Sequence, residues 1–102
     1  MDQIENLMAS IRNFAENRDW EKFHTPKNLA MAIAGEAGEL VAEFQWLTPE
    51  ESCKSELSEE KLRDIRLEMA DVQIYMLRLA DILGIDITAA VREKMEINEA
   101  RF

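Results

Sequence analysis

Apolar residues line two neighbouring faces of the segment 58–83, and this doubled pattern constrains the fold more than any other feature of the chain. One row has spacings of three and four: Leu62, Ile65, Met69, Val72, Met76, Leu79 and Leu83. A second row lies about 100° further round the same predicted helix: Leu67, Ala70, Ile74 and Leu77. Such a helix must be covered from two sides. The second cover is another helix of this chain or a second subunit, and the short chain favours the subunit.

The remainder of the chain also has the helical period, between recognisable start and stop signals. Helices are predicted over 2–18, from Pro26 to about Leu47, from the N-cap Ser58 to Leu83, and over about 87–101. Thr25 before a proline is typical of an N-cap, and Thr48-Pro49 stops the second helix. Gly84 is suited to end the third helix and Asp86 to cap the fourth. Short connections then predict one all-α domain over 1–102, a four-helix bundle.

Composition narrows the class of protein. The chain has 102 residues, and its 21 acidic and 12 basic residues give a net charge of −9. This charge argues against a nucleic-acid polymer as partner. No apolar run approaches the ~20 residues of a membrane span, and the first residues lack the pattern of a signal peptide. The single Cys53 excludes an internal disulfide framework and a thiolate zinc site. We therefore expect a cytoplasmic protein that binds neither membranes nor nucleic acid.

Two pairs of acidic residues stand three apart on consecutive predicted helices. They are Glu36 with Glu39 and Glu68 with Asp71. Residues at this spacing share a helical face, so each pair presents two carboxylates together. A solvated surface is the ordinary explanation, but no Lys or Arg occurs between residues 28 and 53 to balance the first pair. Glu36 also interrupts an apolar stripe, where an unpaired carboxylate would be costly.

Gly35 and Gly38 flank Glu36 within the same predicted helix. Each costs about 1 kcal/mol relative to Ala in a helix interior. Close packing of a facing helix would offset this cost, so we expect an element to approach the helix at these glycines.

A divalent cation would compensate the four carboxylates. Their all-oxygen donor set suits Mg²⁺, with Mn²⁺ as a substitute. A helical di-iron site is excluded because it needs two Glu-x-x-His motifs and the chain has one His. Mg²⁺ on a few carboxylates keeps positions that phosphate oxygens fill. Lys94, Asn98 and Arg101 share a face of the last predicted helix and either hold phosphate or form an ordinary solvated face.

With these motifs in place, the chain resembles the MazG-like, all-α nucleoside triphosphate pyrophosphohydrolases. The resemblance extends over nearly the whole chain: Arg18-Asp19-Trp20, Phe23 to Leu29, Gly35 to Glu39, the Glu68/Asp71 pair, Phe44-Gln45-Trp46, Lys94-Met95, Asn98 and Arg101-Phe102. The aromatic segments are most similar to the dCTP pyrophosphatase branch. The branch can carry a His on its first helix near the base where this chain has Ile11, so the base preference stays open.

The resemblance implies Mg²⁺-dependent hydrolysis of (deoxy)nucleoside triphosphates to monophosphate and pyrophosphate, as house-cleaning of dCTP-like or non-standard nucleotides. It also implies a homo-oligomer, a dimer or a dimer of dimers, with sites formed between subunits. The metal-binding and catalytic residues would be Glu36, Glu39, Glu68 and Asp71. The nucleotide would contact Trp20, Trp46, Tyr75, Lys94 and Asn98. Which carboxylate serves as general base is left open.

The chemistry of individual residues is compatible with these roles. The indoles of Trp20 and Trp46 can stack on a base, or serve as core or subunit contacts. Tyr75 stands four residues after Asp71, on the carboxylate face, where it binds substrate or packs in an interface. His24 is either a substrate contact or a packing residue. Lys27 stands in a first helical turn, where the dipole disfavours a cation, which hints at a phosphate contact.

One hypothesis of another class competes with catalysis. In it the chain is a non-catalytic helical module that binds a partner protein through its apolar rows. It explains the doubled pattern of 58–83 but leaves Glu36 in the apolar stripe unexplained.

Overall fold

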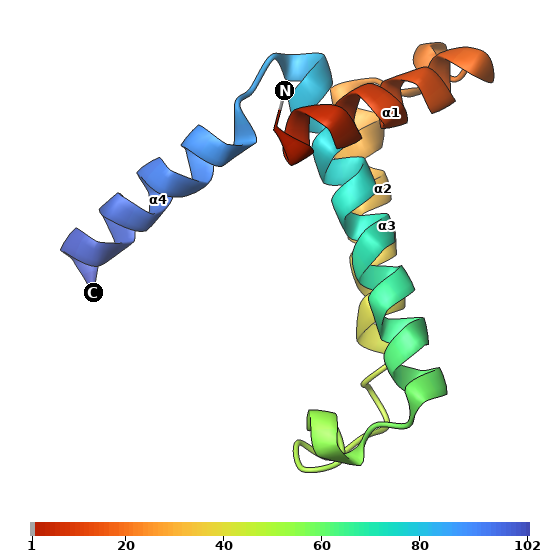
Figure 1. Cartoon of the computed structure of the whole chain (residues 1–102), viewed down its shortest axis with the longest axis vertical. Helices are drawn as coiled ribbons and strands as arrows, with labels where there is room; N and C mark the ends of the chain where they lie inside the picture. The colour runs from red at the N-terminus through yellow and green to blue at the C-terminus, as the bar shows by residue number, and fades with distance from the viewer. Residues whose placement is uncertain (1) are drawn as a thin grey trace.

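The computed structural model describes residues 2–102, so Met1 of the predicted domain lies outside the described residues. Its elements are α1 (Gln3–Asn17), the 3₁₀ turn η1 (Glu21–Phe23), α2 (Pro26–Ala42), the 3₁₀ turn η2 (Lys54–Glu56), α3 (Glu59–Leu83) and α4 (Ile87–Arg101). Residues 2–102 contain four α-helices and no strand (Figure 1). The all-α class is confirmed.

Each long helix begins at a capping side chain that accepts a backbone N–H three residues further on. The caps are Asp2, Thr25, Ser58 and Asp86. Such a cap satisfies one of the free amide donors of a first turn, so it sets a helix start from local sequence alone. The three predicted caps are confirmed. Gly84 ends α3 in the left-handed conformation with φ +67°, which a residue without a Cβ adopts without strain.

The second helix is shorter than predicted. It ends at Ala42, whereas the sequence places its end at about Leu47. Tight i→i+3 bonds take over at this point, with the amide of Phe44 donating to Val41 and that of Leu47 to Phe44. Pro49 restrains only the residue before it, so it could not reveal this earlier end.

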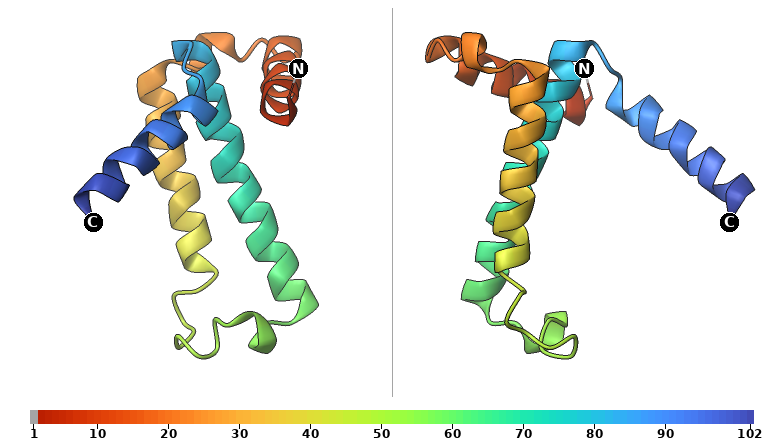
Figure 2. Two further views of the ribbon diagram at one scale, coloured as in Figure 1. Left: turned by 60° about the vertical axis from the view of Figure 1, so that its left-hand side comes forward. Right: turned by 180° about the vertical axis from the view of Figure 1, so that it is seen from behind.

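Helices α2 and α3 form an antiparallel pair, and α1 crosses the pair near the C-terminal end of α3 (Figures 1 and 2). The fully buried apolar side chains come from these three helices: Ala15, Leu29, Ile65, Leu77 and Ala80. Two of them, Ile65 and Leu77, belong one to each predicted apolar row of α3. The pair therefore provides the rigid frame on which the side chains described below are held.

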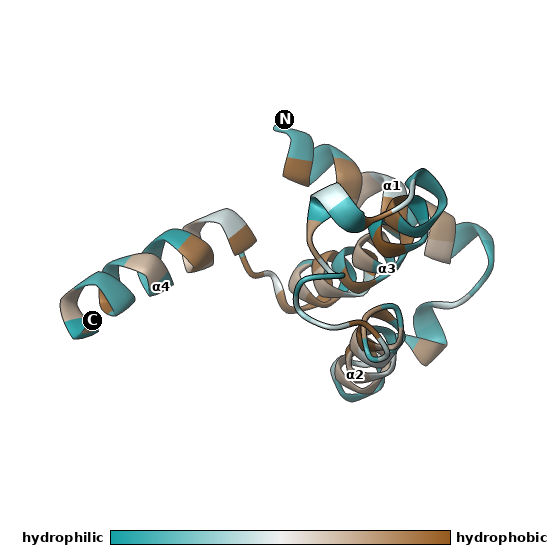
Figure 3. Ribbon diagram, turned by 90° about the horizontal axis from the view of Figure 1, so that it is seen from below, coloured by the Kyte–Doolittle hydropathy of each residue, from teal (hydrophilic) through white to brown (hydrophobic). Residues whose placement is uncertain are grey.

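Helix α4 leaves this frame and extends away from it (Figure 2). Its apolar residues Val91, Met95 and Ile97 are exposed, and brown apolar segments mark the projecting helix in Figure 3. The core of one chain is therefore made by α1, α2 and α3, and α4 does not close the predicted bundle within its own chain. Along α3, Met69 of the first apolar row and Leu67 of the second also remain exposed, so neither row is fully covered by this chain.

None of the helices in the described part of the chain is long and apolar enough to cross a membrane.

Candidate active site

Three of the four predicted carboxylates meet between α2 and α3. Glu36 on α2 and Glu68 and Asp71 on α3 each place one carboxylate oxygen within 4.8 Å of the others. Glu36 and Glu68 are half-buried and Asp71 is exposed. We call these three residues the carboxylate cluster. The fourth predicted residue, Glu39, is exposed and stands outside it.

The carboxylate cluster is a concentration of uncompensated negative charge. Burial raises the pKa of Glu68, and the charges of Asp71, Glu39, Glu36 and Glu43 raise it further, in that order. None of the ion pairs within residues 2–102 includes a member of the cluster. Oxygen donors this close, without a basic partner, suit a hard divalent cation such as Mg²⁺. Glu39 contributes its field even though it lies outside the cluster.

A pocket of about 250 Å³ adjoins the carboxylate cluster and shares two residues with it. Its apolar and aromatic wall consists of Ile11, Phe14, Ala15, Trp20, Ile74 and Tyr75. Its charged and polar groups are Glu36, Asp71, His24 and Arg78. We call it the aromatic pocket. Binding sites for drug-sized ligands begin at about 300 Å³, so this space suits a flat ring rather than a whole nucleotide.

Trp20 arranges one side of the aromatic pocket. Its ring meets Phe14 edge-on, with centroids 5.5 Å apart, and approaches the His24 ring at 6.3 Å. These are favoured aromatic geometries. The indole is nevertheless 42% exposed, so part of its surface remains free to contact a ligand. The structure thus brings Trp20, Tyr75 and His24 of the predicted contacts to one pocket.

A charged network that begins at this pocket was not predicted from the sequence. The Nε of Arg78 donates a hydrogen bond to Nδ1 of His24 at 3.1 Å, and its Nη1 lies 3.5 Å from Asp81. Asp81 also receives two bonds of 2.8 Å from Arg12 on α1. The spacing of Arg78 and Asp81 on one helical face was the only local signal, since the other partners are far away in sequence.

The other predicted contacts do not reach this pocket within one chain. The Trp46 ring is 87% exposed and lies in the turn after α2, and Lys27 is exposed in the first turn of α2. Lys94 and Asn98 stand on the projecting α4. None of these four residues lines the aromatic pocket.

The expectation of a helix packed closely on Gly35 and Gly38 is wrong for this chain. A Cβ built on either glycine would meet no atom within 4 Å, apart from its own helix and neighbours. Both glycines are exposed, because α2 turns the face of Glu36, not theirs, towards α3.

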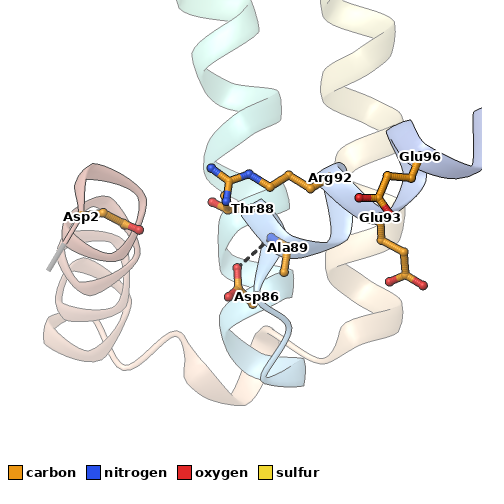
Figure 4. Close-up of a pocket in the computed structure, with 7 residues that line it drawn as sticks. All are labelled: Asp2, Asp86, Thr88, Ala89, Arg92, Glu93 and Glu96. Atoms are coloured by element: carbon orange, nitrogen blue, oxygen red, sulfur yellow. Dashed lines mark hydrogen bonds between the residues drawn. The ribbon is translucent and has the colours of Figure 1, made fainter. Parts of the chain in front are cut away.

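A second pocket lies at the start of α4 (Figure 4). It is lined by Asp2, Asp86, Thr88, Ala89, Arg92, Glu93 and Glu96, without an aromatic ring. Asp86 is already used there, because its carboxylate accepts the Ala89 amide at 3.0 Å. The carboxylate cluster with its aromatic pocket is therefore the better candidate site.

The chain is similar to several known proteins. The chain is 39% identical over 99 residues to dCTP pyrophosphatase 1 of Homo sapiens, which is 97% of this chain and 58% of the human protein. A 35-residue stretch, 34% of this chain and 33% of the relative, is 57% identical to a dATP/dGTP diphosphohydrolase of Cyanophage S-2L. The crystal structure of a pyrophosphatase from Archaeoglobus fulgidus superposes with a TM-score of 0.90 at 40% identity, covering 100% of this chain and 94% of that one.

The chain thus spans less than two thirds of the length of its human relative, but nearly all of the archaeal structure. A model of the MazG-like family matches residues 31–101, which include the whole carboxylate cluster and α4. Because that match covers more than half of its length, the chain belongs to the MazG-like family.

Proposed function

We propose that this protein hydrolyses (deoxy)nucleoside triphosphates to the monophosphate and pyrophosphate, in a single domain over 1–102. One observation carries the proposal: Glu36 and Asp71 belong both to the carboxylate cluster and to the wall of the aromatic pocket. A nucleotide has the matching polarity, with a flat base at one end and phosphates that need a cation at the other. The names of the human, phage and archaeal relatives support the same reaction.

The proposed cofactor is Mg²⁺, with Mn²⁺ as a substitute, held by Glu36, Glu68 and Asp71 and joined by Glu39. The donor set fits, because its oxygens converge without a basic neighbour, and burial together with the surrounding carboxylates raises the pKa of Glu68. When bound, such an ion polarises a phosphoryl group and lowers the pKa of a coordinated water. Without cations the carboxylates would repel a triphosphate, so they would hold the phosphates only together with the ion.

The base would occupy the aromatic pocket. Its 250 Å³ accommodates a ring, and Trp20 offers a partly exposed surface for stacking, worth ~1–3 kcal/mol. Tyr75 lines the same wall and carries a hydroxyl. dCTP-like or non-standard nucleotides are the proposed substrates, in a house-cleaning role in the cytoplasm. Nucleic-acid polymers are not, since a net charge of −9 repels their backbone.

The active form is proposed to be a homo-oligomer, a dimer or a tetramer. Two observations support this: both apolar rows of α3 keep exposed residues, and α4 projects with its own apolar residues exposed. A second copy would cover α3, and it would bring Trp46, Lys94 and Asn98 towards a nucleotide. Lys27 is proposed as a further phosphate contact.

The decisive experiment is an assay of purified protein against a panel of dNTPs and NTPs, each with Mg²⁺, with Mn²⁺ and with EDTA. The panel includes dCTP, dATP and dGTP, because relatives named for pyrimidine and for purine substrates both match the chain. Pyrophosphate and monophosphate are the expected products. Orthophosphate with a diphosphate would contradict the assignment.

The alternative is a non-catalytic helical module that binds a partner protein through its apolar surfaces. The exposed Leu67, Met69, Val91 and Met95 favour it. Such a module has no reason to bind a divalent ion, so Mg²⁺ would leave its melting temperature unchanged. A metal site that forms with the fold would raise it.

A further inference from the structure

Arg78 is buried, with 6% of its surface exposed, and it forms a hydrogen bond with the ring of His24. Its Nε–H donates to Nδ1 at 3.1 Å. A guanidinium has donors and no acceptor, and it does not lose its proton in proteins. Nδ1 of His24 must therefore be the unprotonated acceptor, which leaves the proton of a neutral imidazole on Nε2.

The position of Arg78 is itself fixed from behind. Asp81 lies one turn further along α3, 3.5 Å from Nη1 of Arg78. Arg12 on α1 holds Asp81 through two bonds of 2.8 Å, from Nε and Nη2 to the two carboxylate oxygens. Such a fork has a defined geometry. The chain of contacts from Arg12 through Asp81 and Arg78 thus sets the orientation of the His24 ring.

The other ring nitrogen of His24 has no partner among residues 2–102. No hydrogen bond joins Nε2 to any of them, and none of their buried side-chain nitrogen or oxygen atoms lacks a partner. Nε2 is therefore accessible, on a residue that lines the aromatic pocket. Burial lowers the pKa of His24, and the nearby charge of Arg78 lowers it further, which favours the neutral ring that the hydrogen bond from Arg78 requires. Glu36 and Asp71 line the same pocket, yet neither bonds to the ring.

We propose that His24 is a specificity-determining residue of the aromatic pocket, whose Nε2–H donates a hydrogen bond to a carbonyl oxygen or unprotonated ring nitrogen of the nucleobase, and that Arg78 is its positioning residue. This rests on the proposed function, since it takes a nucleotide as the occupant. The fixed donor discriminates because a base that presents an N–H or amino group at this edge leaves two donors face to face and unpaired.

Two substitutions of His24 separate its two nitrogens. His24→Gln places an amide nitrogen where Nε2 stands and keeps the donor to the pocket. His24→Asn reaches only as far as Nδ1, so it keeps a partner for Arg78 and removes that donor. For the best substrate we expect His24→Asn to raise KM by about 3- to 10-fold, the worth of one neutral hydrogen bond. We expect His24→Gln to restore most of this loss, with kcat little changed in both variants.

The positioning role is tested by nitrogen NMR of the imidazole, which is unambiguous because the chain has one histidine. In the full chain, ¹⁵N-labelled at histidine and carrying no histidine tag, we expect a neutral ring with its proton on Nε2. Asp81→Asn loosens Arg78 without touching the pocket, so it should give a mixture of both tautomers. Lys61→Gln is the matched control, because it removes the 2.9 Å ion pair to Glu43, which lies outside the network.

Each outcome has a defined meaning. A proton on Nδ1 in the wild type, or a His24→Gln variant no better than His24→Asn, overturns this proposal while the proposed function stands. An Asp81→Asn spectrum identical to that of the wild type overturns the part of the proposal in which Arg12 and Asp81 hold Arg78 in position. If the wild type hydrolyses no nucleotide at all, the proposed function and this inference fall together.

Discussion

Two acidic residues of α3, Glu68 and Asp81, lie about three and a half turns apart on one helix and meet opposite surroundings. Arg12 and Arg78 lower the pKa of Asp81, whereas burial and four neighbouring carboxylates raise the pKa of Glu68. Both side chains are half-buried, so burial alone does not explain the difference. The presence or absence of a basic partner does. Paired charge at one end of α3 holds helices together, and unpaired charge towards the other end is available for a ligand.

The strongest test of this contrast removes one charge from the unpaired end. Asp71→Asn keeps the size of the side chain and eliminates an oxygen anion of the carboxylate cluster. We expect kcat to fall by on the order of 100-fold or more, because a lost ligand weakens the stabilisation of phosphoryl charge. The melting temperature should not fall, since a repulsive charge is removed. Pyrophosphate release and circular dichroism give the two measurements.

Asp64→Asn is the matched control, because Asp64 is exposed on the same helix and lies outside the carboxylate cluster. Its kcat should equal that of the wild type. An Asp71→Asn enzyme of wild-type activity would remove Asp71 from the site.

The second test adds Mg²⁺ as a partner for the unpaired carboxylate cluster. Mg²⁺ at 100 times its Kd stabilises a folded protein by about 2.7 kcal/mol, which for a domain of this size is a rise in Tm of about 10 °C or more. The rise should vanish in Glu36→Gln. NaCl at equal ionic strength is the control, because it only screens charge. A rise of equal size with NaCl would show screening and not a site.

The third test breaks the paired end. Asp81→Asn removes the negative charge and one of the two oxygens that accept from Arg12, and we expect the free energy of unfolding to fall by about 1 kcal/mol. Because the pKa of Asp81 is lowered in the folded state, its contribution is present above the ordinary value of 3.8 and is lost as the pH falls through the folded-state value. Urea unfolding at pH 7 and in steps below pH 3.8 should therefore show the wild type and the variant converging in acid.

The smallest expected effect is a contribution to stability that increases, and does not decrease, as the pH falls. Because the pKa of Glu68 is raised in the folded state, the folded protein binds this proton more tightly than the unfolded chain does. Without metal, the wild type should gain stability relative to Glu68→Gln as the pH falls from 7 towards 4.5, the ordinary value. Thermal unfolding of both proteins over this range measures the difference. A gap that stays constant with pH would contradict the raised pKa of Glu68.

The helices could be predicted largely from local sequence. Thr25, Ser58 and Asp86 cap their helices as expected, because a cap needs only the amide three residues ahead. The end of α2 was predicted five residues too late, since weak i→i+3 turns leave no strong residue signal. The expected contact at Gly35 and Gly38 is absent within the chain, because a helical glycine shows its cost but not what faces it.

The residues of the candidate site were also predicted only in part from local sequence. Spacing indicated that Glu68 acts with Asp71, and Glu36 with Glu39, and the structure brings Glu36, Glu68 and Asp71 within 4.8 Å of one another. Spacing could not separate Glu39 from them, because a residue three positions from Glu36 need not point at the same spot on the facing helix. The bond between His24 and Arg78 spans 54 residues, and no local pattern announces it.

By itself, therefore, the sequence determined an all-α chain, three capped helix starts and the concentration of acid on two helical faces. These features depend on neighbours within one or two turns, which covalent geometry brings together whatever the remainder of the chain does. Only the tertiary structure decided which charges are paired. Arg12 reaches Asp81 because α1 crosses α3 at that end, and no ion pair within residues 2–102 brings a basic side chain to the carboxylate cluster. The attraction between two opposite charges weakens with the distance between them, and the distances between helices are set by packing.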